Sequence, residues 1–499
     1  MARSPQLIAE RASASVIVRI GAPEFAALKG LLFRRYPHHE WGTFARFGWR
    51  ETESGLLLTL AALDPPLPEE LNERFGHVVI NEPYSLRMAL EAERHPFAVA
   101  VMHSHPQHCR PDPSHIDDDM DGYYSGYFSG FAPGRPYASL ILSELGGELA
   151  LSGRVWWRSR WLTIGKFCVE RSPVLSWAHG EPALPARFDE SRYARLTAAF
   201  GRQAAERLSR STVAVIGAGG TGSAAIEALA RAGVGRLVVV DPDVVEPSNL
   251  ERLHGGWPSH ANSCATKVEV AREHVHQINH EIEVVPIVGR LPQKEVVDAV
   301  LGADVALGCT DQQHSRLALS EFAFRYLLPS IDCGVVLEGS GGKVTGQILQ
   351  LVRFLTTDPC ALCRRMTDPR RLTRELMSAE ERATRQRAAA DALKRGEPAD
   401  PYWAEEAQLN TVGYLTTVAG AMAAGYAIGW ITGRFEPPFA RLQANLVAKF
   451  MDTTDSEEAA SADCVCQSVR GWADQANADA LITAPSHWPA AKHLPHVEA

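Results

Sequence analysis

Two histidines separated by one residue, His103 and His105, lie at the end of the apolar run FAVAVMHSHP. Because alternate residues of a β-strand point to the same face, both imidazoles can reach one metal ion. Ser114 and Asp117 follow the loop QHCRPDP, and Asp117 would complete a zinc site of two histidines and one carboxylate with an open position for water. Zinc lowers the pKa of such a water toward ~7. A lone H-x-H would indicate only polar residues at a strand end, so this prediction depends on the whole pattern.

The combination of H-S-H-P, a loop, S-x-x-D and an upstream glutamate resembles the JAMM metallopeptidase motif. The resemblance covers the first domain and implies a cytidine-deaminase-like α/β fold. It implies that His103, His105 and Asp117 bind a catalytic zinc. Glu40, in HHEWGTF, would be the general acid/base, and Ser114 would steady the tetrahedral oxyanion.

The loop departs from the family pattern, because eight residues separate His105 from Ser114, one more than is commonest in the family. A loop that contains proline can absorb one residue. Asp118 or Asp119 therefore stays open as the carboxylate ligand. This spacing also leaves open a first domain that docks a carrier without catalysis.

A glycine-rich turn, GAGGTG at residues 217–222, follows the apolar run STVAVI and precedes a helical segment. In such a turn, backbone N–H groups and the helix dipole hold phosphate. Asp241 ends the next apolar run, RLVVVD, where a carboxylate can bind ribose hydroxyls. This much would serve an NAD-dependent oxidoreductase as well as an ATP-dependent enzyme.

Later residues separate these two classes of enzyme. Arg252 and Lys267 are cations, and Asp311 is a carboxylate in the motif CTD, which is more than hydride transfer needs. Phosphoanhydride chemistry uses cations on the transferring phosphate and a carboxylate that holds Mg²⁺. Together with the glycine turn, they resemble the ThiF-type adenylyltransferases, the family that includes ubiquitin-activating enzymes and the activators of sulfur carriers. The nucleotide-site residues that the resemblance implies are Gly217, Gly219, Gly220, Gly222, Asp241, Asp243, Asn249, Arg252 and Lys267, with magnesium at Asp311.

The same resemblance implies a reaction and its partners. The C-terminal glycine of a ubiquitin-like or sulfur-carrier protein attacks the α-phosphate of ATP, which gives an acyl-adenylate and pyrophosphate. Arg195, in the helical segment that leads into the second domain, matches an arginine that in this family reaches the partner subunit's nucleotide. A homodimer is therefore implied, and a conjugating-enzyme-like protein would be one acceptor of the activated carrier.

Four of the nine cysteines form two close pairs, Cys360/Cys363 and Cys464/Cys466. Close pairs within an odd total favour metal binding in a reducing compartment over a disulfide framework. These pairs lie where the ThiF family carries a structural zinc, although C-x-C is tighter than a second C-x-x-C would be. The alternative is four reduced structural thiols.

Residues 364–463 contain no cysteine, although ubiquitin-activating enzymes place there the cysteine that forms a thioester. Cys264 and Cys333 remain as candidates, each against the alternative of a buried structural thiol. We therefore expect the adenylate to pass directly to a separate protein thiol or amine.

The elements that must position these residues are apolar runs alternating with helical segments, the pattern of an α/β protein. In the second half, the runs STVAVI, RLVVVD, EVVPIV, DVALGC and PSIDCG are typical of a doubly wound, Rossmann-like, mostly parallel sheet. The arginine- and glutamate-rich residues 364–400 predict a solvated helical excursion. The predicted organisation is a JAMM domain at 1–157, a linker at 158–187, a ThiF-type domain at 188–470 and a loosely ordered tail at 471–499.

The composition excludes several classes of protein. The 499 residues include 50 Lys and Arg against 59 Asp and Glu, so no basic excess is available to neutralise a nucleic acid or an anionic membrane. Residues 407–433 carry no charge and are long enough to span a bilayer, but their Ala, Gly and Thr content favours a buried or interface helix. The N-terminus has no uninterrupted apolar signal core, and we expect a cytoplasmic protein.

As a whole, the sequence predicts a JAMM metallopeptidase fused to a ThiF-type adenylyltransferase, from a bacterial ubiquitin-like or sulfur-carrier system. The expected cofactors are a catalytic zinc, a structural zinc, ATP and magnesium. A peptidase that trims a carrier would expose the glycine that the second domain adenylates. The same peptidase could instead release the carrier from finished conjugates.

Overall fold

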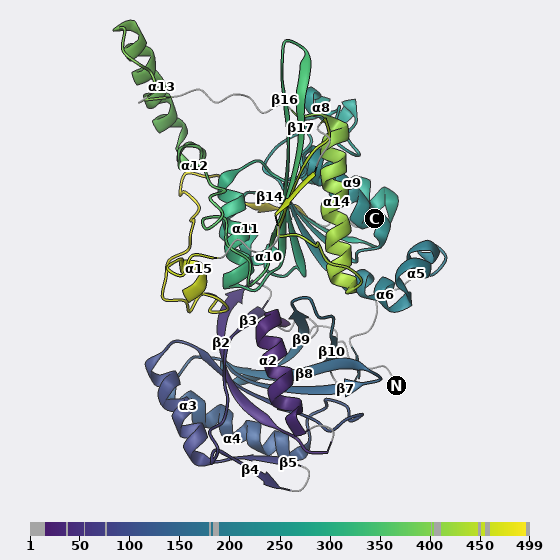
Figure 1. Ribbon diagram of the computed structural model, residues 1–499, viewed down its shortest axis with the longest axis vertical. Helices are drawn as coiled ribbons and strands as arrows, with labels where there is room; N and C mark the ends of the chain where they lie inside the picture. Colours follow the sequence, from purple (N-terminus) through teal and green to yellow (C-terminus); the bar gives the residue numbers. More distant parts are fainter. Residues whose placement is uncertain are drawn as a thin grey trace. The chain divides into compact units, whose positions relative to one another are not determined.

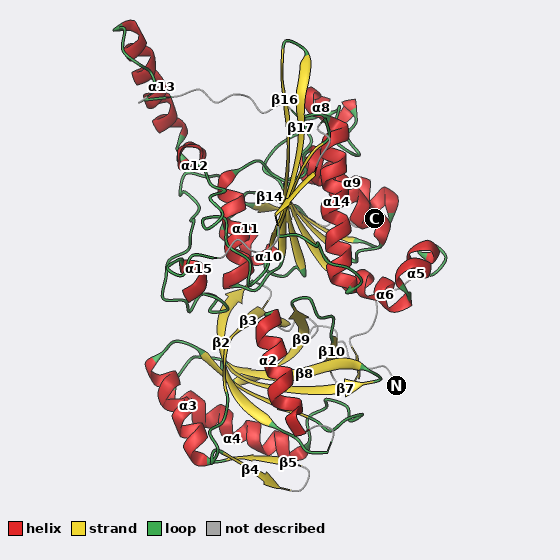
Figure 2. Cartoon of the chain, in the orientation of Figure 1, coloured by secondary structure: helices red, strands yellow, loops and turns green. Residues whose placement is uncertain are grey.

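The computed structural model describes residues 15–35, 38–53, 55–74, 77–178, 181–182, 189–400, 402–403, 411–447, 451–454 and 460–495. The chain divides into two compact units, shown by sequence in Figure 1 and by secondary structure in Figure 2. Unit 1 takes its described residues from Met1–Pro185, Ala323–Leu328 and Val465–Asp479. Unit 2 takes its described residues from Ala186–Phe322, Pro329–Cys464 and Ala480–Ala499.

The main sheet of unit 1 closes into a barrel. Its strands are β1 (Ser15–Ile20), β2 (Gly42–Thr52), β3 (Gly55–Asp64), β6 (Ala98–Ser104), β7 (Tyr137–Leu145), β8 (Glu148–Trp157), β9 (Arg160–Val169), β10 (Leu175–Ala178) and β11 (Glu181–Pro182), with a separate pair β4 (Leu71–Arg74) and β5 (His77–Ile80). The order is β8-β7-β6-β2-β3-β1-β9, and β9 pairs again with β8. Beyond β8 the sheet continues into β10 and β11. The first domain is therefore an α/β region that contains a barrel.

The closing strand β9 corrects the predicted domain boundary. A linker was predicted from residue 158, but β9 hydrogen-bonds to both β1 and β8. Its alternate residues Leu162 and Ile164 are buried in the barrel core, which explains why this stretch folds as a strand.

Helices cover two faces of the unit 1 sheet. They are α2 (Ala22–Leu32), the 3₁₀ turn η2 (Phe33–Arg35), α3 (Glu82–Arg94) and α4 (His115–Phe131). Side chains of β6 alternate between two cores, because Met102 packs with α2 whereas Val101 packs with α3 and α4. Figure 2 shows α3 and α4 beside the sheet. The same alternation directs His103 toward the α4 side.

Unit 2 contains the predicted parallel sheet. Its strands are β12 (Thr212–Ile216), β13 (Arg236–Val240), β14 (Glu283–Val288), β15 (Val305–Gly308), β16 (Ser330–Ser340), β17 (Lys343–Phe354), β18 (Arg441–Asn445), β19 (Met451–Thr454) and β20 (Lys492–His493). The order is β19-β18-β17-β16-β15-β12-β13-β14-β20. The five strands from β16 to β14 are parallel, which confirms the prediction of a Rossmann-like fold. Antiparallel strands extend the sheet at both edges.

Helices α7 (Gly220–Ala232), α9 (Lys267–Ile278) and α14 (Gly413–Thr432) pack on this sheet, with their buried side chains in one core with those of β12 and β13. The remaining helices of the chain are α5 (Ala194–Phe200), α6 (Arg202–Arg210), η3 (Pro247–Asn249), α8 (Pro258–Asn262), α10 (Lys294–Val300), α11 (Gln313–Arg325), α12 (Pro369–Leu376), α13 (Ala379–Lys394) and α15 (Val465–Ser468).

Helix α14 is the one candidate membrane span among the described residues, by length and composition only. In the structure, its residues Ala419, Ala423 and Ala427 lie in the main core of unit 2. At Gly420 a Cβ would lie 2.2 Å from the Thr221 carbonyl, so a glycine is needed for the approach of α14 to α7. The helix is thus packed as a core helix of the α/β domain, as the composition indicated.

The tail after residue 470 is also more ordered than predicted. Trp472 packs in the core of unit 1, where a Cβ at Gly48 would lie 2.2 Å from the Trp472 carbonyl carbon. Thr59 Oγ1 donates to the Gly471 carbonyl at 2.7 Å, and Asp474 pairs with Arg50 at 3.0 Å. Aromatic burial and these polar contacts outweigh the Ala- and Pro-rich composition on which the prediction was based.

Candidate functional sites

The first candidate site brings together His103, His105 and Asp117, as predicted. Their ligand atoms all lie within 4.8 Å of one another. Asp117 Oδ1 is 3.1 Å from His103 Nε2, and Asp117 Oδ2 is 3.6 Å from His105 Nε2. The histidines come from the end of β6, and Asp117 comes from the first turn of α4, which packs on the same face.

The environment of these three residues fits a metal ion. His105 Nδ1 lies 2.9 Å from the Arg110 carbonyl, which leaves Nε2 for a metal. His103 Nε2 is buried and faces Asp117 Oδ1 at 3.1 Å, so both atoms point into the same small space. Burial raises the pKa of Asp117, but the two imidazoles outweigh burial and hold this pKa well below its usual value. A charged carboxylate beside two imidazoles is a donor set that zinc accepts.

Ser114 is the N-cap residue of α4, and its hydroxyl is hydrogen-bonded to Asp117. Its hydroxyl and its backbone N–H both donate to Asp117 Oδ2 at 2.7 Å. Ser114 Oγ also accepts from the Asp117 backbone N–H at 3.3 Å. The described contacts make Ser114 a helix cap that orients the carboxylate, while its predicted role as an oxyanion donor stays a prediction.

The longer loop between His105 and Ser114 is held by neighbouring strands. Hydroxyls of Ser143 and Ser152 donate to carbonyls of the loop, and Trp177 Nε1 donates to Asp112 Oδ1 at 2.7 Å. These contacts absorb the extra residue, so that α4 still begins beside the histidines.

The two alternative carboxylates are placed differently from Asp117. Asp118 pairs with Arg154 at 2.7 Å, and Asp119 is exposed. Among the three aspartates only Asp117 belongs to the cluster with the histidines.

Glu40 precedes β2, the strand that pairs with β6. Gly42 lies opposite His103 in this pairing, and the Trp41 backbone N–H donates to Ser104 Oγ at 3.1 Å. Burial lowers the pKa of His105, but its partners, among them Asp117 and Glu40, raise it above the usual value. The charge of Glu40 therefore acts on the metal cluster.

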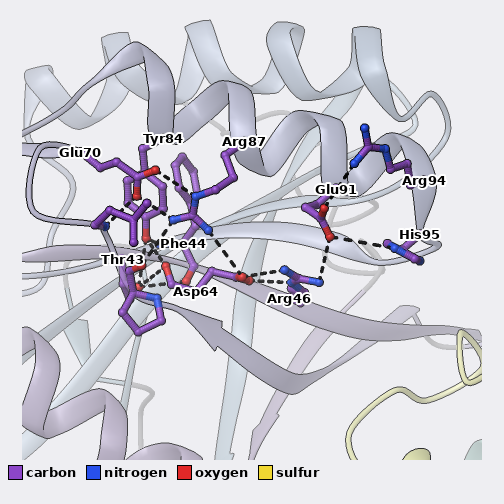
Figure 3. A network of polar contacts seen from close by, with 12 residues as sticks. Thr43, Phe44, Arg46, Asp64, Glu70, Tyr84, Arg87, Glu91, Arg94 and His95 are labelled. Carbon is purple, nitrogen blue, oxygen red and sulfur yellow. Dashed lines mark hydrogen bonds and ion pairs between the residues drawn. The ribbon is translucent and has the colours of Figure 1, made fainter.

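A polar network fixes β2 against β3 and α3 (Figure 3). The Tyr84 hydroxyl accepts from the Phe44 backbone N–H at 2.8 Å and donates to the Asp64 carbonyl. Arg46 donates to both carboxylate oxygens of Asp64 at 2.7 Å. Burial raises the pKa of Tyr84 to about 12, so its hydroxyl stays a donor at neutral pH. The network holds β2, which begins at Gly42 just after Glu40, beside the strand of the histidines.

The second candidate site begins at the glycine turn between β12 and α7. Gly217 has a φ of +95°, which favours glycine, and a Cβ at Gly222 would lie 1.7 Å from the Gly217 carbonyl oxygen. A Cβ at Gly220 would lie 3.0 Å from Arg252 Cδ, so the Arg252 side chain lies against the turn. Gly219 is the N-cap of α7, with its backbone extended. The turn is therefore tight enough to present backbone N–H groups at the start of a helix.

Asp241 follows β13 and is buried beside this turn. Its Oδ2 accepts from the Ala218 backbone N–H at 2.7 Å, and its Oδ1 accepts from the Asp243 backbone N–H at 2.9 Å. Lys267, the first residue of α9, pairs with Asp243 at 2.8 Å. Burial raises the pKa of Asp241, whereas the charge of Lys267 acts to lower it.

A cavity of about 650 Å³ lies at the carboxyl ends of β12, β13, β14 and β15, where open α/β sheets bind ligands. Of the predicted site residues, Gly217, Asp241, Asp243 and Asp311 line the cavity. Lys267 pairs with the lining residue Asp243, whereas Arg252 lies against Gly220 of the turn, which does not line the cavity. Asn249 accepts from the Glu246 backbone N–H at 3.1 Å and does not line the cavity.

Asp311 follows β15 and is paired with Arg371, which was not among the predicted site residues. Arg371 NH2 lies 3.2 Å from Asp311 Oδ2 and 2.8 Å from the Asp311 carbonyl. An exposed carboxylate that already attracts a cation fits the chemistry of Mg²⁺ binding. Glu375 pairs with Arg371 at 3.3 Å and accepts from the backbone N–H groups that begin α11.

Two segments line the cavity although the sequence did not predict that they would. Residues 364–400 were predicted to be a solvated helical excursion, and α13 is one, with most of its residues exposed, whereas α12 lines the cavity with Arg371, Arg374 and Glu375. His487, Trp488 and Pro489 also line it, from the tail that was predicted to be loosely ordered. Two features of the sequence could have indicated these segments: an Arg and a Glu four residues apart after the first cysteine pair, and a tryptophan in a tail of small residues.

The four paired cysteines come together as one cluster. Cys360, Cys363, Cys464 and Cys466 have sulfurs within 4.8 Å of one another. Cys360 Sγ lies 3.7 Å from Cys363 Sγ and 3.6 Å from Cys464 Sγ. A tetrahedral zinc with Zn–S bonds of ~2.3 Å separates its sulfurs by about 3.8 Å. The donor set and its spacing therefore fit a structural zinc, and the C-x-C pair is accommodated.

The remaining predicted residues do not line the cavity. Cys333 is buried opposite Cys309, with 3.6 Å between the sulfurs, and the contact with Cys309 and burial raise the pKa of its thiol. Cys264 is exposed and has a φ of +51°. Arg195 is exposed on α5, the helix before α6.

Comparisons with known proteins bear on unit 2. The chain is 34% identical over 165 residues to adenylyltransferase and sulfurtransferase UBA4 of Saccharomyces cerevisiae, which covers 33% of this chain and 35% of UBA4. It is 35% identical over 163 residues to the SAMP-activating enzyme E1 of Haloferax volcanii, which covers 33% of this chain and 56% of that enzyme. The chain thus spans about a third and about half of the lengths of these two relatives.

A solved structure of Escherichia coli MccB is 19% identical with a TM-score of 0.41, and the alignment covers 56% of this chain and 75% of MccB. This similarity is too distant to assign an activity. Residues 193–467, more than half of the chain, match the ThiF family. This match lies within the domain predicted at 188–470 and confirms the resemblance found in the sequence. The chain belongs to the ThiF family.

Proposed function

We propose that unit 2 uses ATP to adenylate the C-terminal glycine of a ubiquitin-like or sulfur-carrier protein. The observation that carries this proposal is the presence of Gly217, Asp241 and Asp311 on one cavity at the ends of neighbouring parallel strands. The names of the relatives, an adenylyltransferase and an activating enzyme, support the same reaction. Hydride transfer by an NAD-dependent enzyme would give no role to Asp311.

In the proposed reaction, a carboxylate oxygen of the carrier's glycine attacks the α-phosphorus of ATP. A new P–O bond forms, the bond from the α-phosphorus to the bridging oxygen breaks, and pyrophosphate leaves with the electron pair. Backbone N–H groups of the glycine turn, with Arg252 and Lys267, would offset the charge of the phosphates. Asp241 would hold the ribose hydroxyls. Magnesium held by Asp311 would neutralise phosphate charge when bound.

ATP–pyrophosphate exchange tests this proposal. The purified chain is incubated with small proteins that end in glycine, and wild type is compared with Asp311→Ala. Exchange that requires both a carrier and Asp311 is expected. Exchange that is equal in the variant, or a nicotinamide-dependent thermal shift without exchange, would contradict adenylation.

We propose that unit 1 is a zinc-dependent peptidase of the JAMM type that acts on the same carrier. The supporting observation is the cluster of His103, His105 and Asp117, whose ligand atoms all lie within 4.8 Å of one another. Zinc at this site would supply an activated water for hydrolysis. Glu40 would take a proton at its carboxylate and return it to the leaving amine.

Metal analysis and cleavage assays separate a peptidase from a docking module. Wild type is expected to hold zinc and to shorten a C-terminally extended carrier, whereas Glu40→Gln should hold zinc but not cleave. Cleavage of isopeptide conjugates with no trimming of the precursor would assign the peptidase to carrier release. Zinc-loaded wild type that cleaves neither substrate would leave unit 1 as a docking module.

The partners and the compartment follow from this chemistry. We propose a homodimer in which Arg195 reaches the partner subunit's nucleotide, and a separate protein that accepts the activated carrier. Residues 364–463 contain no cysteine, which supports direct transfer to that acceptor. A cluster of thiolates and a reaction that consumes ATP suit the cytoplasm. Sulfur-carrier activation remains the second candidate, supported by the sulfurtransferase in the name of UBA4.

A further inference from the structure

The segment from Pro485 to Pro495 lies outside the part of the chain that matches the ThiF family, yet it is built into unit 2. Strand β20 pairs with β14 at the edge of the parallel sheet. Gln293 Nε2 donates to the Pro489 carbonyl at 2.7 Å, and Arg272 donates to the Pro495 carbonyl at 2.7 Å. These bonds fix the segment on both sides of β20.

Trp488, in this segment, lines the cavity and is supported by two other side chains. The centroid of its ring lies 4.9 Å from that of His314, and the Arg290 guanidinium lies 5.8 Å from the Trp488 ring. His314 Nδ1 lies 2.7 Å from the Leu291 carbonyl, which fixes the imidazole. Burial lowers the pKa of His314 to about 4, so the imidazole is neutral at pH 7. The indole is thus a supported aromatic surface in the cavity wall.

The strand order indicates which part of a nucleotide would meet this surface. The glycine turn follows β12, Asp241 follows β13, and Arg290 lies just beyond β14, which is the next strand on the side away from β12. If phosphates lie at the turn and the ribose at Asp241, the base lies toward β14, because the ribose separates base from phosphates. Trp488 lies between Arg290 at this end and His314 of α11, which follows β15, so its ring spans the cavity wall between the ends of β14 and β15.

We propose that Trp488 stacks on the purine ring of ATP, so that the C-terminal segment completes the nucleotide site. This inference rests on the proposed adenylation. The indole is a wall of the site and not a plug, because the cavity keeps a volume of about 650 Å³ with Trp488 in place. That volume lies within the ~300–1,000 Å³ of small-molecule sites.

The test measures the Michaelis constant for ATP in ATP–pyrophosphate exchange. Loss of one base–aromatic stack corresponds to a weakening of roughly tenfold, so Trp488→Ala should raise KM for ATP by about that factor with little change in kcat. Trp488→Phe keeps a ring and should restore KM to within about threefold of wild type. Inhibition by tripolyphosphate, which has no base, should be the same in all three proteins.

Trp257→Ala is the matched control, because Trp257 is 61% exposed on α8 and does not line the cavity. An unchanged KM for ATP in Trp488→Ala, or an equal loss of tripolyphosphate inhibition, would overturn the inference. Tighter ATP binding in Trp488→Ala would overturn it too, since the segment would then be a plug.

Failure of the proposed function is distinguishable from failure of this inference. If wild type supports no exchange with any carrier, equilibrium dialysis with ATP still compares wild type with Trp488→Ala. Weaker binding of ATP by the variant than by wild type would support the stacking role without adenylation. Equal binding by both proteins, or no binding by wild type, would reject it.

Discussion

The two candidate sites differ in how much of the chain builds them. The candidate metal ligands of unit 1 lie between His103 and Asp117, on one strand and the helix that follows it. The cavity of unit 2 takes its walls from segments between residues 216 and 489. A site built from one short segment depends on local geometry, whereas a site built from distant segments depends on the whole fold.

The two sites also differ in how far along the chain their supporting residues lie. Around the metal cluster, Ser114 and the Arg110 carbonyl orient the ligands, and both lie in the same stretch of sequence. Around the cavity, Glu375 reaches the first turn of α11, and Gln293 holds the C-terminal segment. Disturbing the first site should therefore have local effects, and disturbing the second should expose contributions from distant residues.

The largest effect is expected from Asp117→Asn. The amide keeps the shape of the carboxylate but lacks its charge, so zinc content should fall from about two equivalents to about one, with the cysteine cluster still occupied. Peptidase activity should fall by more than the roughly 10–100-fold seen when an outer-shell partner of a metal ligand is lost. Inductively coupled plasma mass spectrometry and a cleavage assay measure the two quantities.

Asp118→Asn is the matched control, because Asp118 is the next residue of α4 and pairs with Arg154 at 2.7 Å instead of with the histidines. It should keep both zinc equivalents. Loss of zinc in Asp118→Asn, with zinc retained in Asp117→Asn, would show that Asp118 and not Asp117 is the ligand.

The second effect is expected from Asp311→Ala in unit 2. Removing one group that stabilises the charge of the transition state costs about 100- to 1,000-fold, so pyrophosphate exchange should fall by that factor. Zinc content should stay unchanged, because Asp311 belongs to neither metal cluster. Asp391→Ala, on the exposed face of α13, is the control and should exchange at the wild-type rate. An equal loss in both variants would mean that general surface charge, not Asp311, supports exchange.

The contrast between the two sites also explains what the sequence could predict. Period-two alternation placed His103 and His105 on one face of a strand, and the resemblance to the JAMM motif added Asp117, with Asp118 and Asp119 left open. Asp241 was found in the same way, since a carboxylate at the end of a strand after a glycine turn has a known place in the fold. Both predictions used geometry that is fixed within one or two elements.

The residues that the sequence missed are those whose place depends on tertiary packing. Arg371 lies in a charged stretch that favours solvation, and only the docking of α12 on the start of α11 brings it to Asp311. Trp488 reaches the cavity because β20 pairs with β14, which is far from it in the chain. Ser114 was identified, but its contact with Asp117 became apparent only from the hydrogen bonds.

A smaller effect is expected from Arg371→Ala, which tests a residue of the dispersed site. Arg371 lines the cavity beside Asp311, and we expect it to donate to the phosphates. Hydrogen bonds to charged groups are worth ~1.5–3 kcal/mol, so losing one should raise KM for pyrophosphate by at least about tenfold. Arg371→Lys should recover part of the loss, because a single charge replaces the guanidinium fork. Arg387→Ala, which removes an exposed arginine of α13, is the control. A change confined to the magnesium dependence would show that Arg371 only neutralises Asp311 until Mg²⁺ binds.

The smallest effect is expected from Ser114→Ala, and it separates two roles for one hydroxyl. As a helix cap and a support for Asp117, Ser114 should contribute about 1 kcal/mol to the free energy of unfolding and no more than about tenfold to zinc affinity. As an oxyanion donor, it would contribute about 100- to 1,000-fold to the cleavage rate. Glycine is accepted at an N-cap and lowers the free energy of unfolding by only a few tenths of a kcal/mol. Ser114→Gly therefore removes the hydroxyl while it keeps most of the stability that the cap provides. The hydrogen bonds from Ser114 to Asp117 favour the role of a cap and support, with the smaller effect on cleavage. Cleavage rates of both variants at saturating zinc decide between the two roles. Ser129→Ala, in the same helix, is the control.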